Sequence, residues 1–216
     1  MGTLKVEHVV VSLCATNCYI LFDDQTLKGC IIDPGESPAR IEKKVSDLGL
    51  SIECIILTHG HFDHIGACPE TRKKYACKVI ALKEAAQELR DIDLNLTGQM
   101  EGVPISVTAD KDVSDGDILD ICGHKCKVIH TPGHTPGSMC LYFEEEKILI
   151  AGDTLFCESL GRFDLPGGDG RKIIASITNK LFTLPEDTVV YPGHGETTTI
   201  GHELKYNPCA EYIGQF

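Results

Sequence analysis

Three histidines and a carboxylate stand within six positions of one short segment of the chain. The segment His59-Gly-His61-Phe-Asp63-His64 directly follows the apolar run 52–57, which is typical of a strand buried on both faces. Imidazole nitrogens and carboxylate oxygens are good ligands for divalent zinc, iron or manganese. Four such groups so close together predict a binding site for one metal ion or for two.

Three further segments place a ligand type at the end of an apolar strand. They are Pro-Gly-His134-Thr-Pro-Gly, Gly-Asp153-Thr and Pro-Gly-His194. Strand ends with glycine and proline turns are where α/β sheets hold their functional residues. A carboxylate such as Asp153 can bridge two cations that would otherwise repel each other. His130 stands just before His134 and is a further candidate on spacing alone.

The elements that position these segments follow from the periodicity of apolar residues. Alternation and short apolar runs predict strands at 5–13, 18–22, 30–33, 52–57, 79–82, 118–121, 125–129, 139–143, 148–151 and 189–191. Helical spacing predicts helices at 37–48, 64–75, 84–90, 173–181 and 201–206, with a loop over 91–112. Strand blocks that alternate with helices predict two sheets with helices packed outside them, in one domain over residues 1–216.

Composition and charge limit the class of protein. A chain of 216 residues that is 42% hydrophobic and 24% charged is typical of a globular protein, and its apolar runs are too short to cross a membrane. The net charge of −12 disfavours nucleic acids and anionic membranes, so a small molecule is the expected partner. Eleven cysteines without an export signal predict a cytoplasmic location. Cys122 and Cys126 are expected in a β-hairpin rather than in a structural metal site.

The ligand motifs, taken in chain order from His59 to His194, resemble those of the metallo-β-lactamase superfamily, and Asp33-Pro-Gly fits as well. The resemblance implies an α/β fold, a four-layer αββα sandwich with the metal site at the edge of the two sheets. It also implies two divalent metal ions, with zinc preferred over iron or manganese. The implied ligands are His59, His61 and His134 for one ion, Asp63, His64 and His194 for the other, and Asp153 for both. The remaining histidines match no ligand position and are interpreted as structural: His8, His124, His130 and His202.

The segment 152–169 indicates which branch of the superfamily the chain resembles. Its Gly-Arg162-x-Asp stretch resembles the glyoxalase II-like hydrolases and the related persulfide dioxygenases. Class B β-lactamases lack a bridging aspartate of the Gly-Asp153-Thr kind, flavodiiron proteins usually have glutamate where His61 stands, and the nucleases are generally longer. Full-length glyoxalase II proteins append a helical region that binds glutathione, and we do not expect that region here, because only 22 residues follow His194. The resemblance is therefore to the short, single-domain type.

Hydrolysis of a thiolester is the expected reaction, with S-2-hydroxyacylglutathione or a related small thiolester as substrate. Two cations that share a water lower its pKa enough to supply hydroxide near neutral pH. Asp63 is the expected catalytic residue, because a carboxylate close to that water orients it or accepts its proton. A thiol has a pKa near ~8.5, so the thiolate leaves without a dedicated general acid.

Several alternatives stay open at this point. Arg162 is expected to contact the substrate, or else to form a surface ion pair with Asp164 or Asp169. A persulfide dioxygenase of this family holds one iron through residues that match His59, His134 and Asp153. A lactonase or another ester hydrolase would use the same attack by hydroxide, and a non-enzymatic metal-binding role is a third interpretation.

Overall fold

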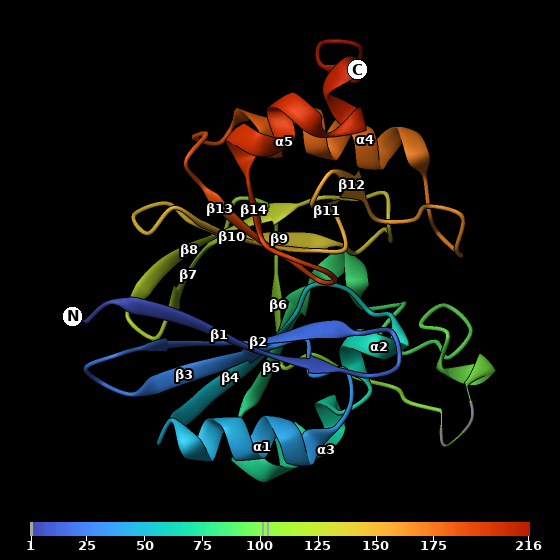
Figure 1. Ribbon diagram of the computed structural model, residues 1–216. Coiled ribbons are helices and arrows are strands. Elements are labelled where there is room, and N and C mark those ends of the chain that lie inside the picture. The colour runs from blue at the N-terminus through green and yellow to red at the C-terminus, as the bar shows by residue number, and fades with distance from the viewer. Residues whose placement is uncertain (1, 101, 103) are drawn as a thin grey trace.

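The described strands form two six-stranded sheets that face each other (Figure 1). The computed structural model describes residues 2–100, 102 and 104–216. In the first sheet the strand order is β1-β2-β3-β4-β5-β6; the pairs from β1 to β3 are antiparallel, and those from β3 to β6 are parallel. Its strands are β1 Leu4–Val11, β2 Thr16–Asp23, β3 Lys28–Ile32, β4 Ser51–Leu57, β5 Lys78–Leu82 and β6 Lys111–Val113.

The second sheet has the order β14-β13-β10-β9-β8-β7 and is antiparallel except where β10 pairs with β13. Its strands are β7 Ile118–Ile121, β8 His124–His130, β9 Met139–Phe143, β10 Ile148–Gly152, β13 Val189–Pro192 and β14 Thr198–Thr199. A separate small hairpin consists of β11 Leu155–Phe156 and β12 Ser159–Leu160.

Helices cover the outer faces of both sheets, so the predicted four-layer αββα sandwich is confirmed. Figure 1 shows α1 and α3 on the outside of the first sheet and α4 and α5 on the outside of the second. The helices are α1 Pro38–Asp47, α2 Phe62–Ile65, α3 Cys68–Tyr75, α4 Gly170–Asn179 and α5 Ile200–Tyr206. The 3₁₀ turns are η1 Lys83–Ala85, η2 Thr97–Gln99, η3 Leu181–Thr183 and η4 Pro208–Tyr212. None of the described helices has the length and apolar character that a membrane span requires.

Three apolar layers hold this arrangement together. The layer between the sheets takes side chains from both, among them Tyr19, Leu21, Ile56, Val128, Leu141 and Phe143. On the outside of the first sheet, α1 contributes Ile41 and Val45, which lie one turn apart on its buried face. On the outside of the second sheet, α4 contributes Ile173 and Ile177 in the same way. Full burial of each such side chain stabilises the fold by about 1.5–3 kcal/mol.

The helix predicted over 64–75 is wrong in its continuity, because the structure divides it into α2 and α3. Gly66 packs against the carbonyl of Gly35, where a Cβ atom would lie only 2.2 Å from the oxygen. The backbone N–H of Ala67 donates to the Pro34 carbonyl (2.9 Å) instead of continuing the helix. Pro69, which has no N–H, then lies in the first turn of α3, directly after Cys68. The break lets α2 approach the turn after β3.

The helix predicted over 84–90 is also wrong, since only the short turn η1 forms there. The Leu89 carbonyl accepts a hydrogen bond from the backbone N–H of Val107 (2.8 Å), across the following loop. Helix-type bonds remain only as isolated turns, such as the bond from the Leu89 N–H to the Ala85 carbonyl (2.9 Å). The loop predicted over 91–112, of which residues 101 and 103 lie outside the described part, contains η2 and ends in β6.

Candidate metal centre

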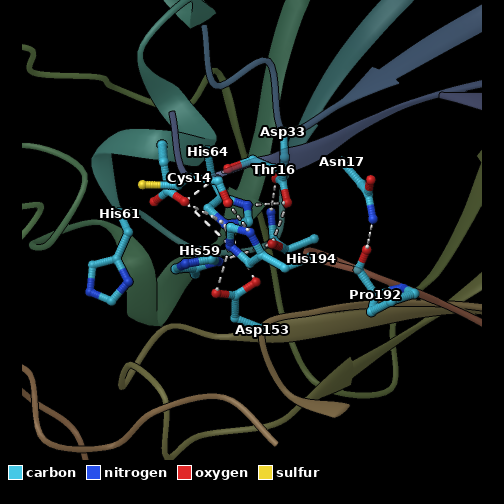
Figure 2. Close-up of polar contacts among 12 residues, drawn as sticks. Cys14, Thr16, Asn17, Asp33, His59, His61, His64, Asp153, Pro192 and His194 are labelled. Atoms are coloured by element: carbon cyan, nitrogen blue, oxygen red, sulfur yellow. Dashed lines mark hydrogen bonds and ion pairs between the residues drawn. The ribbon is translucent and has the colours of Figure 1, made fainter. Parts of the chain in front are cut away.

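The seven ligand residues expected from the sequence come together at one edge of the sandwich, where strands of both sheets end. Figure 2 labels five of them: His59, His61, His64, Asp153 and His194. After β4 and within α2, the first sheet supplies His59, His61, Asp63 and His64. After β8, β10 and β13, the second sheet supplies His134, Asp153 and His194. All of these residues except His194 are buried, with less than a tenth of their surface exposed. The polar groups thus meet in a place that water reaches mainly from one side.

One group consists of His59, His61 and His134, whose ring nitrogens approach a common point. His134 Nε2 lies 3.3 Å from His59 Nε2 and 2.9 Å from His61 Nδ1. Burial lowers the pKa of all three imidazoles, and burial together with the neighbouring His134 lowers the pKa of His61 to about 3. The rings are therefore neutral at pH 7 and present lone pairs, as imidazole ligands of a divalent cation do.

The second group consists of Asp63, His64 and His194 and carries a carboxylate. His194 Nε2 lies 3.3 Å from Asp63 Oδ2 and 3.4 Å from His64 Nε2. Burial by itself would raise the pKa of Asp63, but the charge of His64 and hydrogen bonds from His194 and Thr16 outweigh burial and lower it. Burial by itself would lower the pKa of His64, but the carboxylates of Asp153 and Asp63 outweigh burial and raise it to about 9. Asp63 is thus ionised at neutral pH.

Asp153 lies between the two groups and contacts both. Its Oδ2 is 3.5 Å from His134 Nε2 and 3.3 Å from His194 Nε2, and its Oδ1 is 3.4 Å from His64 Nε2. Burial would raise its pKa, but the charge of His64 lowers the pKa of Asp153 below its ordinary value. One ionised carboxylate therefore reaches the ligand atoms of both groups, which is the position that a bridging ligand takes.

Four of these histidines have the other ring nitrogen next to a protein oxygen. The pairs are His59 Nδ1 with Thr58 Oγ1 (3.1 Å), His64 Nδ1 with Asp33 Oδ2 (2.9 Å), His134 Nδ1 with the Arg162 carbonyl (2.7 Å) and His194 Nδ1 with the Cys14 carbonyl (3.0 Å). A histidine that binds a metal typically donates its second N–H to such an oxygen, which fixes the ring orientation. The histidines are therefore oriented as metal ligands are.

Two atoms at the centre lack a hydrogen-bond partner among the described residues. They are Nε2 of His61 and Oδ1 of Asp153, both fully buried. An unpartnered buried polar atom is costly, so each calls for an occupant that the protein itself does not supply. A set of imidazole nitrogens and carboxylate oxygens fits zinc, iron or manganese. The residues present therefore fit the divalent ions that the fold implies.

Two polar residues hold the ligands from behind, and sequence reasoning assigned neither of them a role. Asp33 accepts hydrogen bonds from the backbone N–H (2.8 Å) and the hydroxyl (2.6 Å) of Thr58, in addition to its contact with His64. Thr16 donates its hydroxyl to Asp63 Oδ2 (2.9 Å). The position of Asp33 after a strand could have marked it. Thr16 carries no such signal, because threonine is common within strands.

The loop that carries His194 is fixed to the first sheet through Asn17 on β2. The backbone N–H of Asn17 donates to the Gly193 carbonyl (2.7 Å), and its side-chain amide donates to the carbonyls of Pro192 and Gly195 (3.0 Å each). Figure 2 shows the bond between Asn17 and Pro192 beside the ligand cluster. These bonds join the two sheets at the site, so the groups from the two sheets keep their spacing.

A cavity of about 470 Å³ lies next to the ligands, and Arg162 lines it. The Arg162 guanidinium donates to both carboxylate oxygens of Asp164 (2.8 and 2.9 Å), and the side chain is exposed. The ion pair expected as one alternative is therefore present, with Asp164 rather than Asp169 as the partner. Apolar side chains form much of the remaining wall: Phe62, Leu96, Phe156, Leu160 and Leu165.

The other histidines and the cysteines lie outside these two groups. His130 Nε2 pairs with the Pro136 carbonyl (2.9 Å), in keeping with a structural role. Cys122 and Cys126 lie in the predicted hairpin, which is β7 and β8. All eleven cysteines have free thiols. The cysteine pattern therefore adds no ligand to the centre.

The chain matches the family model of the metallo-β-lactamase superfamily over residues 11–194. It is 34% identical over 211 residues to the hydroxyacylglutathione hydrolase GloC of Haemophilus influenzae, with 95% of this chain and 97% of that protein covered. The match therefore extends over almost the full length of both chains.

Two solved structures also align with this chain over most of its length. The structure of BLEG-1, described as a B3 metallo-β-lactamase, aligns with a TM-score of 0.89 and 37% identity over 94% of this chain and 98% of that one. The structure of TTHA1623 in a di-iron-bound form aligns with a TM-score of 0.83 and 32% identity over 94% and 99%. Proteins of this fold thus include one that binds two iron ions.

Proposed function

Because the chain belongs to the metallo-β-lactamase superfamily, a group of metallohydrolases, we propose that it is a binuclear enzyme that hydrolyses thiolesters. The proposed substrate is S-2-hydroxyacylglutathione or a related small thiolester. The observation that carries the binuclear assignment is the position of Asp153, whose carboxylate contacts histidines of both groups. The similarity to a hydroxyacylglutathione hydrolase supports the choice of substrate.

The proposed ligand roles follow the two groups. His59, His61 and His134 hold one divalent ion, Asp63, His64 and His194 hold the other, and Asp153 contacts both. Zinc is the preferred metal, with iron or manganese as alternatives that the di-iron relative supports. Bound there, two divalent ions would supply an activated water and polarise the substrate carbonyl.

Asp63 is the proposed catalytic carboxylate. Its low pKa keeps it ionised at neutral pH, so it can orient a water or accept a proton from it. Thr16 holds Oδ2 of that carboxylate in place, which leaves the rotation of Asp63 little freedom. The proton acceptor is therefore positioned before substrate arrives.

The walls of the cavity favour a thiolester over a more demanding substrate. A thiolate is a good leaving group, since its conjugate acid has a pKa near ~8.5, and it departs without a proton donor. The apolar side chains of Phe156, Leu160 and Leu165 suit the carbon chain of an acyl or thiol group. Arg162 is proposed to contact the thiol half of the substrate from the cavity rim, in exchange for its bond to Asp164.

The experiment that tests this function is thiol release, followed with a thiol-reactive dye. Protein loaded with zinc, iron(II) or manganese(II) is given S-lactoylglutathione and, separately, an uncharged thiolester. We expect turnover of at least one thiolester and its loss in Asp153→Asn. Metal-replete wild-type protein that releases thiol from neither substrate would refute the proposal.

A second candidate is an oxidoreductase of the persulfide dioxygenase kind with a single iron. It is favoured by His134 Nε2, which contacts both His59 Nε2 and Asp153 Oδ2, so that these three residues form one compact set. Elemental analysis and oxygen consumption with a persulfide distinguish the two enzymes. One iron per chain together with oxygen uptake would select the dioxygenase. A β-lactam and a lactone belong in the same assay series, the first because of the similarity to BLEG-1.

We also propose a cytoplasmic location and a small-molecule partner, without nucleic acid or membrane contacts. Eleven free thiols suit a reducing compartment, and the net charge of −12 repels phosphate backbones and anionic lipids. Fractionation of cells that make the native chain tests the location. Recovery of the chain outside the cytoplasmic fraction would contradict it.

A further inference from the structure

Glu88 is a buried carboxylate directly behind one of the two ligand groups. It lies after η1, in the segment where the sequence predicted a regular helix, and its side chain is 5% exposed. The exposed Glu84, four residues earlier in the same segment, has its carboxylate near Lys83 instead (3.7 Å). A carboxylate rarely points inward, so the contacts of Glu88 require an explanation.

Glu88 joins the two loops that carry His59, His61 and His134. Its Oε1 accepts a hydrogen bond from the backbone N–H of Gly60 (2.5 Å) and another from the hydroxyl of Thr135 (3.1 Å). Gly60 lies between two of the ligands, and Thr135 directly follows the third. One oxygen atom therefore connects the loop after β4, in the first sheet, to the loop after β8, in the second.

The packing around Glu88 leaves little room for another arrangement. A Cβ atom at Gly60 would lie 2.6 Å from Glu88 Cγ, so only glycine permits this approach. A Cβ atom at Gly137 would lie 2.3 Å from the Ala85 backbone, which shows that η1 also presses on the loop beyond Thr135. Thr135 is itself held by Ser138, whose hydroxyl lies 3.0 Å from its own. The segment from η1 to Glu88 is thus packed against both ligand loops.

From this geometry we propose that Glu88 is a positioning residue that sets the separation of His59 and His61 from His134. It does not reach the centre itself and acts through Gly60 and Thr135. The group Asp63, His64 and His194 is held by Asp33, Thr16 and Cys14 instead, as the contacts above show. Loss of Glu88 should therefore weaken one ion site and spare the other. The inference rests on the ligand roles in the proposed function.

The test measures the affinity of both ion sites by competition with a chromophoric chelator, and the spectrum of cobalt(II)-loaded protein. Glu88→Ala removes the acceptor, whereas Glu88→Gln keeps an oxygen that can accept both hydrogen bonds. We expect Glu88→Ala to weaken one of the two sites about 10- to 100-fold, as loss of a group behind a ligand does, and to change the cobalt spectrum. Glu88→Gln should restore affinity to within a few-fold of wild type, and the matched control Glu84→Gln should match wild type.

Thr135→Val keeps the side-chain shape and removes the hydroxyl that donates to Glu88. This variant tests the positioning role of Glu88 if the Glu88→Ala protein does not fold. We expect it to weaken the same single site to a smaller degree. Wild-type affinity at both sites in Thr135→Val and in a folded Glu88→Ala protein would overturn the inference, as would equal weakening of both sites or equal losses in the Ala and Gln variants. Wild-type protein that binds no metal would instead refute the proposed function.

Discussion

The molecule has two buried clusters of histidine and carboxylate side chains, one at each end of β2. Only one of these clusters has the geometry of a metal centre. Thr16 and Asp23 begin and end β2, so the two clusters lie at opposite ends of an eight-residue strand, about 23 Å apart. At the end away from the centre, His124 lies between Asp23 and Glu146. Its Nδ1 is 2.5 Å from Glu146 Oε1 and its Nε2 is 3.3 Å from Asp23 Oδ2.

The difference between the clusters lies in the direction of the nitrogen atoms. Both nitrogens of His124 face an acceptor of their own, so the ring is held between a carboxylate of the first sheet and one beside the second. At the other end, His134 Nε2 lies within 3.3 Å of nitrogens on His59 and His61, while protein oxygens hold the outer nitrogens of His59 and His134. With their outer N–H groups donated to those oxygens, His59 and His134 have inner nitrogens whose lone pairs face each other at 3.3 Å. Both clusters contain the same residue types, so the metal site is distinguished by ring nitrogens that point toward a common position.

Replacement of Asp153 should produce the largest effect, because Asp153 belongs to the cluster that contains the proposed metal ligands. Asp153→Asn removes the negative charge that both groups share, and we expect it to lower metal content below two ions and kcat about 10³-fold. Elemental analysis and thiol release check this. The matched change at the other end, His124→Gln, should keep both ions. Full metal content in Asp153→Asn would show that the carboxylate does not bridge.

Asp63→Asn should have the next largest effect, because it removes a proton acceptor while keeping the size of the side chain. We expect kcat to fall about 10²-fold, the usual range for loss of a general base. Steady-state kinetics on metal-replete protein measure it, with metal content determined in the same sample. A variant that keeps its metal ions and its full turnover would remove Asp63 from the catalytic role.

The pH dependence of stability should differ between the metal-free protein and its Glu88→Gln variant. Burial raises the pKa of Glu88 from 4.5 to about 7, against the opposing hydrogen bonds from Thr135 and Gly60. Between these values the folded state holds a proton that the unfolded state has lost. The free energy of unfolding should therefore fall as pH rises from about 4.5 to about 7, on the order of 3 kcal/mol in total.

Urea unfolding of the metal-free protein across that range measures the slope. Glu88→Gln cannot titrate at this position, so its curve should be flatter by the same amount. Parallel curves for the two proteins would show that Glu88 is ionised throughout. The Glu84→Gln protein is the control, because that side chain is exposed and should leave the slope unchanged.

At the opposite end of the strands, His124→Gln should cost stability without loss of metal. The His124 ring is 2% exposed, and the variant loses hydrogen bonds between two sheets, so we expect about 1–3 kcal/mol less free energy of unfolding. Chemical denaturation checks this, and elemental analysis of the same protein completes the comparison with Asp153→Asn. Loss of metal ions in His124→Gln would break the distinction between the two ends.

Arg162→Ala should give the smallest effect. The guanidinium is exposed and already bonded to Asp164, so its contribution to substrate binding is a difference between two solvated contacts. We expect KM for the glutathione thiolester to rise ~2- to 5-fold, with kcat little changed. The uncharged thiolester serves as the control and should show no change. An unchanged KM for both substrates would leave Arg162 with only its surface ion pair.

Local patterns in the sequence were sufficient for much of the fold and for the ligand types. Alternating apolar residues located the strands of both sheets except the short edge strands β6 and β14, and the motif from His59 to His64 marked the first ligand loop. These patterns can be read from the sequence because they depend only on residues close together along the chain. The set of seven ligands at one edge was implied only by the resemblance to the metallo-β-lactamase superfamily, because position at the end of a strand also admitted His130.

Contacts between distant segments were decided only by the tertiary structure. Glu88 bonds to Gly60 and Thr16 to Asp63 across 28 and 47 positions of the chain, and neither pairing has a signature in the sequence. The broken helix before Pro69 and the missing helix around Glu88 have the same origin, because backbone groups there bond to other loops. The residue types that bind a cation are local information. Their orientation depends on strand order and on the groups packed behind them, which exist only after the two sheets have come together.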